Sequence, residues 1–158
     1  PMGTVIQCVC GKQGWMDAMQ GPQDMPPEMV AEMGNQRERD LWFVLTGYQH
    51  LKLQALPEES NVEGRPAQAV FVASDRVKNW TIYLDKETHR IVRMDYGDRG
   101  ITGAPVEAKE SFEDYRQVDG IWWPYRHRIA HDDAPLANLT VSSVKVNTGV
   151  TADTFKKP

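Results

Sequence analysis

The sequence of 158 residues lacks both a strong excess of one charge and any long apolar run. It holds 18 Lys and Arg against 22 Asp and Glu, a formal net charge of -4. This balance disfavours a nucleic-acid-binding protein, whose binding face is usually strongly basic. No apolar run approaches the ~18 residues that a membrane-spanning helix needs.

The start of the sequence, PMGTVIQCVC, lacks the charged region and the long apolar region that make up a signal peptide. It also places Pro1 ahead of the first methionine. We therefore expect a mature product, or a piece of a longer protein.

Cysteine is scarce, and its only two residues, Cys8 and Cys10, are spaced as Cys-x-Cys. In a strand the two side chains point to one face, about 6.6 Å apart. A disulfide between such near neighbours is strained. We interpret them as two free thiols in a strand, with half of a metal site as the alternative.

Motifs of catalysis are missing as well. Neither H-E-x-x-H nor H-x-x-E-H occurs, so the chain lacks the active site of a zincin-type peptidase. His127 and His131 lie about 13 Å apart along a strand, too far to share a zinc ion with bonds near ~2.1 Å. We expect no enzymatic activity, no metal and no cofactor in this chain.

Alternating, β-rich segments separated by Gly, Asp and Pro turns fill the sequence after residue 50. They are 50–56, 67–74, 79–85, 89–96, 106–118, 121–130 and 136–147. No helical pattern separates them, which indicates an antiparallel sheet of about seven strands. A further strand is expected at 4–10.

Helix is predicted only between residues 26 and 48, as one bent helix or two short ones. Asp24 is interpreted as the cap of its first turn. Asn35 resembles the start of a capping box that begins the helix again, and Gly47 is a reasonable terminator. Together with the strands, this predicts an α+β fold.

The segment 121–130 is predicted to form a strand with two unlike faces. The preceding Asp119-Gly120 is a strong hairpin signal. Pro124 lacks a backbone donor, which favours an edge position or a bulge. Alternation places Ile121, Trp123, Tyr125, His127 and Ile129 on one, mostly apolar face, and Trp122, Pro124, Arg126, Arg128 and Ala130 on the other.

The C-terminal segments FEDYRQVDGIWWPYRHRI and LTVSSVKVNTGVTADTFKKP resemble the end of the LolA-like family, the relatives of the outer-membrane lipoprotein carrier. GRPAQAVFV at 64–72 and YLDKETHRIVRMDY at 83–96 are similar to the family's middle hairpins, and CGKQGWM at 10–16 to its glycine-tryptophan turn. The resemblance implies a strongly curved antiparallel sheet, an incomplete barrel, that is covered by helices and encloses an apolar cavity. The strands that the family has ahead of this turn are missing, so we expect one domain, 1–158, without its N-terminal strands.

The resemblance also implies a context. Similar modules follow zinc peptidases of the pitrilysin and insulinase type, and the carrier acts in the bacterial periplasm or cell envelope. We expect a non-catalytic module that binds a lipid, an acylated molecule or another hydrophobic ligand, and that belongs to a larger zinc peptidase. The alternative is a structural accessory domain of a peptidase, without a ligand of its own.

Methionine gathers in one short region, and Met25, Met29 and Met33 are spaced by four residues, as on one helical face. This stripe is either plain core or a soft lid over an apolar cavity, since methionine adapts to varied apolar partners. The candidate ligand-binding residues are Met25, Met29, Met33, Trp42, Trp80, Ile82, Trp123 and Tyr125.

The segment 4–10, TVIQCVC, carries no charge and no proline that would protect an exposed edge strand. We therefore expect it to pair with another strand, in a homodimer or with a missing segment.

Overall fold

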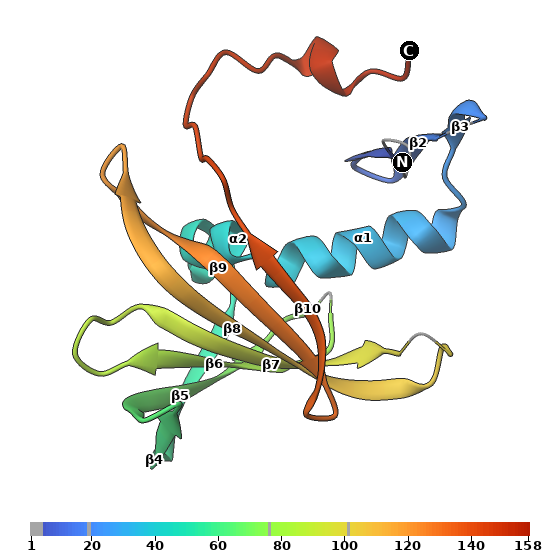
Figure 1. The fold of residues 1–158 in the computed structure, drawn as a ribbon. Coiled ribbons are helices and arrows are strands. Elements are labelled where there is room, and N and C mark those ends of the chain that lie inside the picture. Colours follow the sequence, from blue (N-terminus) through green and yellow to red (C-terminus); the bar gives the residue numbers. More distant parts are fainter. Residues whose placement is uncertain (1–4, 19, 76, 101) are drawn as a thin grey trace. The chain divides into compact units, whose positions relative to one another are not determined.

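The computed structural model describes residues 5–18, 20–75, 77–100 and 102–158. Contacts between residues divide the chain into two compact units. One, called the terminal unit below, consists of residues 1–48 and 147–158, and the other, called the sheet unit, of residues 49–146 (Figure 1).

The terminal unit begins with a three-stranded antiparallel sheet. Its strands are β1 (Ile6–Cys10), β2 (Gln13–Ala18) and β3 (Gly21–Asp24), in the order β1-β2-β3. Asp24 was predicted to cap the first turn of the helix, and this is wrong, because it is the last residue of β3. Ladder pairs such as Trp15 with Asp24 extend the sheet instead.

The strand β1 is an edge strand of this sheet, and its strand partner among the described residues is β2. Its predicted pairing in a homodimer therefore stays a prediction. Residue 4, the first of the predicted strand, lies outside the described residues.

Two helices follow, as predicted: α1 (Pro27–Arg39) and α2 (Leu41–Gly47). The predicted restart at Asn35 is wrong, because α1 continues through this residue. The break lies at Asp40, whose backbone is extended and whose carboxylate accepts a hydrogen bond of 2.9 Å from the backbone N–H of Trp42. Asp40 thus caps α2, a position that aspartate favours.

Two short 3-10 turns complete the helical structure, η1 (Tyr48–His50) and η2 (Ala152–Phe155). Beyond 48 the described residues therefore contain no α-helix, as predicted. None of the described helices combines the length and the apolar character that a membrane crossing requires.

The sheet unit is an antiparallel sheet of seven strands in the order β10-β9-β8-β7-β6-β5-β4. The strands are β4 (Lys52–Val62), β5 (Arg65–Ala73), β6 (Trp80–Asp85), β7 (Ile91–Arg99), β8 (Pro105–Val118), β9 (Ile121–His131) and β10 (Ala134–Thr140). The ribbon curves strongly (Figure 1), and β4 and β10 remain its two edges. The predicted α+β fold with a curved, incomplete barrel is confirmed, although β10 ends earlier than the segment 136–147 implied.

The hairpin between β8 and β9 forms where Asp119-Gly120 predicted it. Val118 pairs with Ile121, and the two residues between them have φ angles of 49° and 84°. Two successive positive φ angles define the turn that matches strand twist, and Asp-Gly is among the pairs that favour it. Pro124 lies beyond the part of β9 that pairs with β10, which ends at Arg126 and Thr140, so its missing donor interrupts no bond to β10.

Trp123 and Trp122 lie on opposite faces of β9, and we expect alanine at Trp123 to destabilise the protein more. The side chain of Trp122 is 44% exposed beneath the guanidinium of Arg90, whereas Trp123 is half-buried. Because the cost of truncating an aromatic side chain grows with its burial, the difference in free energy of unfolding should be about 1 kcal/mol or more. Denaturant melts of the two variants measure it, and equal or reversed midpoints would contradict the assignment of faces.

Candidate ligand-binding site

The terminal unit contains a pocket of about 500 Å³, a volume within the ~300–1,000 Å³ that small-molecule sites usually have. Buried apolar or weakly polar side chains form much of its lining, namely Cys8, Trp15, Met25 and Val30. Cys8 and Trp15 are ladder partners, so their side chains share one face of the three-stranded sheet. The sheet, the start of α1 and the C-terminal segment together line the pocket, which opens to solvent on one side.

Met25 reaches the pocket because Gly14 has no side chain. The backbone N–H of Met25 donates to the carbonyl of Gly14 at 2.9 Å. A Cβ at Gly14 would lie 3.0 Å from the Met25 sulfur and 3.0 Å from the carbonyl oxygen of Cys8. Any larger residue there would therefore displace Met25 or the strand itself.

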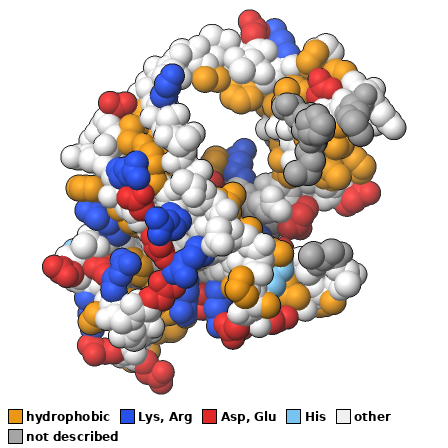
Figure 2. Space-filling model, viewed as in Figure 1, with side chains coloured by type: hydrophobic (Ala, Val, Ile, Leu, Met, Phe, Trp, Pro, Cys, Tyr) orange, Lys and Arg blue, Asp and Glu red, His pale blue; other side chains and the backbone are white. Residues whose placement is uncertain are grey.

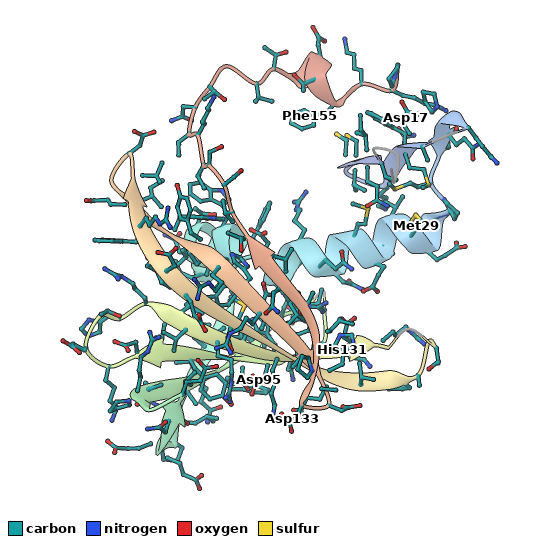
Figure 3. The ribbon with its side chains drawn as sticks, viewed as in Figure 1. Asp17, Met29, Asp95, His131, Asp133 and Phe155 are labelled. Atoms are coloured by element: carbon teal, nitrogen blue, oxygen red, sulfur yellow. The ribbon has the colours of Figure 1, made fainter. Side chains whose placement is uncertain are left out.

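The C-terminal segment is attached to this sheet through the carbonyl of Phe155. The indole Nε1–H of Trp15 donates to this oxygen at 2.9 Å, and the thiol of Cys8 donates to it at 3.3 Å. Phe155 is labelled on its 3-10 turn in Figure 3. Since burial of an unpaired indole donor is costly, this hydrogen bond favours the seated segment.

The rim of the pocket is polar and carries more positive than negative charge. Lys12, Lys156 and Lys157 line it, and Asp24 is the one carboxylate among its lining residues. The ammonium of Lys157 forms an ion pair of 2.9 Å with Asp24. The pocket thus combines an apolar interior with a cationic opening.

Both cysteines are free, and both line the pocket, Cys8 as a buried and Cys10 as an exposed residue. This is the state that their spacing predicted. Among the described residues, no group of three or more His, Cys, Asp and Glu side chains is arranged to hold a metal ion.

Of the eight residues predicted to bind ligand, Met25 is the one that lines this pocket. It lies between β3 and α1 rather than on the helix, so the spacing by four does not place it on one helical face with the other two methionines. Met29 and Met33 do lie on α1, where Met29 is 37% exposed and Met33 is half-buried. Trp42 lies on α2 and is 41% exposed.

The other four predicted residues belong to the sheet unit. Ladder pairs place Trp80 beside Val72 and Ile82 beside Met94, and these four side chains form one buried apolar face. Tyr125 is also buried and Trp123 is half-buried, both on β9. This face is the apolar one that alternation predicted.

Two histidine–carboxylate pairs interrupt that apolar face, and sequence reasoning missed them. His127 Nδ1 lies 3.0 Å from Glu110, and the ring of Phe112 stands against His127 in a T-shaped contact. His131 Nε2 lies 3.4 Å from Asp98. The carboxylates come from β7 and β8, so only the strand register brings them to the two histidines.

The opposite face of the sheet carries a polar network. The hydroxyl of Tyr83 donates to Asp95 at 2.9 Å, and the guanidinium of Arg93 pairs with the same carboxylate at 2.8 Å and lies 4.0 Å from the Tyr83 ring centroid. Burial raises the pKa of Tyr83. Arg128 binds both Glu63 and Glu113. Basic and acidic side chains alternate over the sheet unit in the lower part of Figure 2, and Figure 3 labels Asp95 there.

Three residues that build the pocket, Trp15, Val30 and Phe155, were not predicted as site residues. Two of them stand in segments that resemble the LolA-like family, Trp15 in the glycine-tryptophan turn and Phe155 in the closing segment LTVSSVKVNTGVTADTFKKP. The structure joins these segments through the hydrogen bond from Trp15 to Phe155. The resemblance of both segments to one family was the sequence signal that could have identified Trp15 and Phe155 as site residues.

The fold is similar to the crystal structure of a domain from Vibrio parahaemolyticus, which carries the provisional description of an outer-membrane lipoprotein-sorting protein domain. The TM-score is 0.62 at 13% identity, and the match covers 98% of this chain and 69% of the other. The chain has a LolA-like fold. No family model and no curated protein sequence matches it. At this identity the likeness concerns the LolA-like fold itself, and function has to be argued from the site.

Proposed function

We propose that the chain is a non-catalytic module that binds a lipid, an acylated molecule or another hydrophobic ligand in the bacterial cell envelope. The observation that carries the proposal is the pocket of the terminal unit, with Trp15, Met25 and Val30 in its lining. Concave, mostly apolar sites with few polar groups are typical of small-molecule binding. The LolA-like fold supports the same function, because the similar domain is described as one that sorts lipoproteins.

The driving force would be burial of apolar surface. Burial of apolar surface contributes roughly 25 cal/mol per Å². Burial of a hydrocarbon chain of modest length in the pocket would therefore offset the entropy that the ligand loses on binding. The polar groups of the pocket would orient the ligand rather than supply the affinity. Of the predicted contacts, Met25 belongs to this pocket. Met29, Met33, Trp42, Trp80, Ile82, Trp123 and Tyr125 lie outside its lining, and a role for them in binding stays a prediction from the sequence.

Cys10 offers a direct test, because it is exposed and lines the pocket. In a Cys8→Ser variant, Cys10 is the single thiol and can be alkylated with N-phenylmaleimide. We expect the unmodified variant to enhance the fluorescence of N-phenyl-1-naphthylamine, an uncharged apolar probe. The adduct should occupy the opening and lower this enhancement about fivefold or more, since a loss of ~1 kcal/mol in binding already gives a factor of five.

A matched control places the same adduct elsewhere. In Cys8→Ser/Cys10→Ser/Ser143→Cys, the only thiol lies at an exposed position of the sheet unit, outside the pocket. Its adduct should leave the enhancement unchanged. Absence of any enhancement in the unmodified protein, or an equal loss from both adducts, would contradict the proposed function of the pocket.

A further inference from the structure

We propose that the pocket of the terminal unit selects ligands whose apolar chain ends in an anionic head, and that Lys12 binds this head. The inference rests on the proposed function and adds to it the charge of the ligand and a residue that determines specificity. The shared chemistry is a hydrocarbon chain with a carboxylate or a phosphate, whether from a free acid or from a lipid headgroup.

The pairing of the rim lysines points to Lys12. The ammonium of Lys157 is paired with Asp24 at 2.9 Å, and that of Lys156 with Asp153 at 2.5 Å. For Lys12 the described residues provide no carboxylate partner. The charge of Lys12 at the opening is therefore not neutralised by the protein, and an anionic group of the ligand can form an ion pair with it.

The position of Lys12 fits a head group rather than a chain. Lys12 lies in the turn between β1 and β2, next to the ladder pair Cys10 and Gln13, and all three line the pocket. The buried lining residues Trp15 and Val30 belong to the apolar part. A ligand with its anion at this turn and its chain against the apolar lining would satisfy both parts. A cationic head would instead be repelled by three lysines and attracted by one carboxylate.

The expected preference is moderate, because Lys12 is exposed. Exposed ion pairs contribute about 0.2–1 kcal/mol, which corresponds to a preference of up to about fivefold. Added salt should weaken it, since screening acts strongly on exposed charges. The apolar contribution should change little.

The experiment displaces N-phenyl-1-naphthylamine from the full chain with amphiphiles of one chain length, each kept below its critical micelle concentration. Tridecanoate, dodecyl phosphate, dodecanol and dodecyltrimethylammonium all carry a dodecyl chain and differ only in their heads. We expect the two anions to displace the probe at about three- to fivefold lower concentration than dodecanol, and the cation to require the highest concentration. Whether tridecanoate or dodecyl phosphate displaces the probe more readily distinguishes a free acid from a phosphate headgroup.

Lys12→Glu should abolish this preference for anions and leave displacement by dodecanol unchanged. Lys78→Glu is the matched control, because Lys78 is exposed in the sheet unit and does not line the pocket. It should retain the preference. Equal displacement by tridecanoate and dodecanol in the natural sequence, or a preference that survives Lys12→Glu, would overturn the inference. In both cases the uncharged probe still binds, whereas failure of the proposed function would show as absence of probe binding in every variant.

Discussion

Replacement of Trp80 with alanine is expected to lower the free energy of unfolding of the sheet unit by about 3–5 kcal/mol. Trp80 is 2% exposed and lies beside Val72 on the apolar face of the seven-stranded sheet. Truncation would leave a cavity that the neighbouring strands cannot fill, since the ladder fixes their backbone. Denaturant unfolding followed by circular dichroism measures the loss in free energy of unfolding, provided that this free energy depends on denaturant concentration with the same slope in both proteins.

We expect the loss for Trp80→Ala to fall in the lower half of that range because of the indole Nε1. Among the described residues this buried atom has no hydrogen-bond partner, so alanine also removes an unsatisfied donor, which is favourable. Trp80→Phe tests this, because it keeps most of the apolar volume and loses the donor. Phenylalanine should lower the free energy of unfolding clearly less than alanine, and equal losses in the two variants would contradict close packing around Trp80. Trp122→Ala, at a 44% exposed site, is the control for an accessible tryptophan.

Replacement of Arg93 with methionine is expected to lower the free energy of unfolding by about 3 kcal/mol, the second largest of the effects that we predict. The side chain of Arg93 is 23% exposed and that of its partner Asp95 is 13% exposed. Loss of the guanidinium would leave the Asp95 carboxylate largely buried, with the hydroxyl of Tyr83 as its remaining side-chain donor among the described residues. An uncompensated, largely buried charge is strongly destabilising.

A double variant separates the cost of the broken pair from the value of the intact pair. Arg93→Met/Asp95→Leu removes both charges, and it should recover most of the stability lost in the single variant, because apolar replacements of buried ion pairs are often neutral. Thermal and denaturant melts of the two variants and the natural sequence give the comparison. A double variant as unstable as Arg93→Met alone would show that the pair is needed for packing rather than for charge balance.

Local signals in the sequence determined much of the sheet unit. The turn at Asp119-Gly120 and the alternation of strand 121–130 depend on residues close in sequence, and the structure confirms both the hairpin and the burial of Tyr125. The helical region between 26 and 48 was also correct, but its break was placed at Asn35 instead of Asp40. Asn35 and Asp40 both belong to the residue types that favour the N-cap of a helix, so the sequence alone does not show which of them begins the second helix.

The methionine pattern shows where periodicity misleads. Met25, Met29 and Met33 satisfy a helical spacing, yet Met25 precedes the helix. The reason is local pairing: the backbone of Met25 bonds to Gly14, and the missing side chain of Gly14 accommodates the Met25 sulfur. A spacing rule carries no information about such a partner eleven residues earlier in the chain.

The sequence by itself determined the fold class and the sheet with its apolar face, because period-two patterns and turn residues act over a few residues. Only the tertiary structure decided the pocket. It joins Trp15 to the carbonyl of Phe155 across 140 positions of the chain, and it pairs Lys157 with Asp24 while Lys12 finds no carboxylate among the described residues. Contacts between such distant segments depend on how the strands and the C-terminal segment come together, which no local pattern encodes.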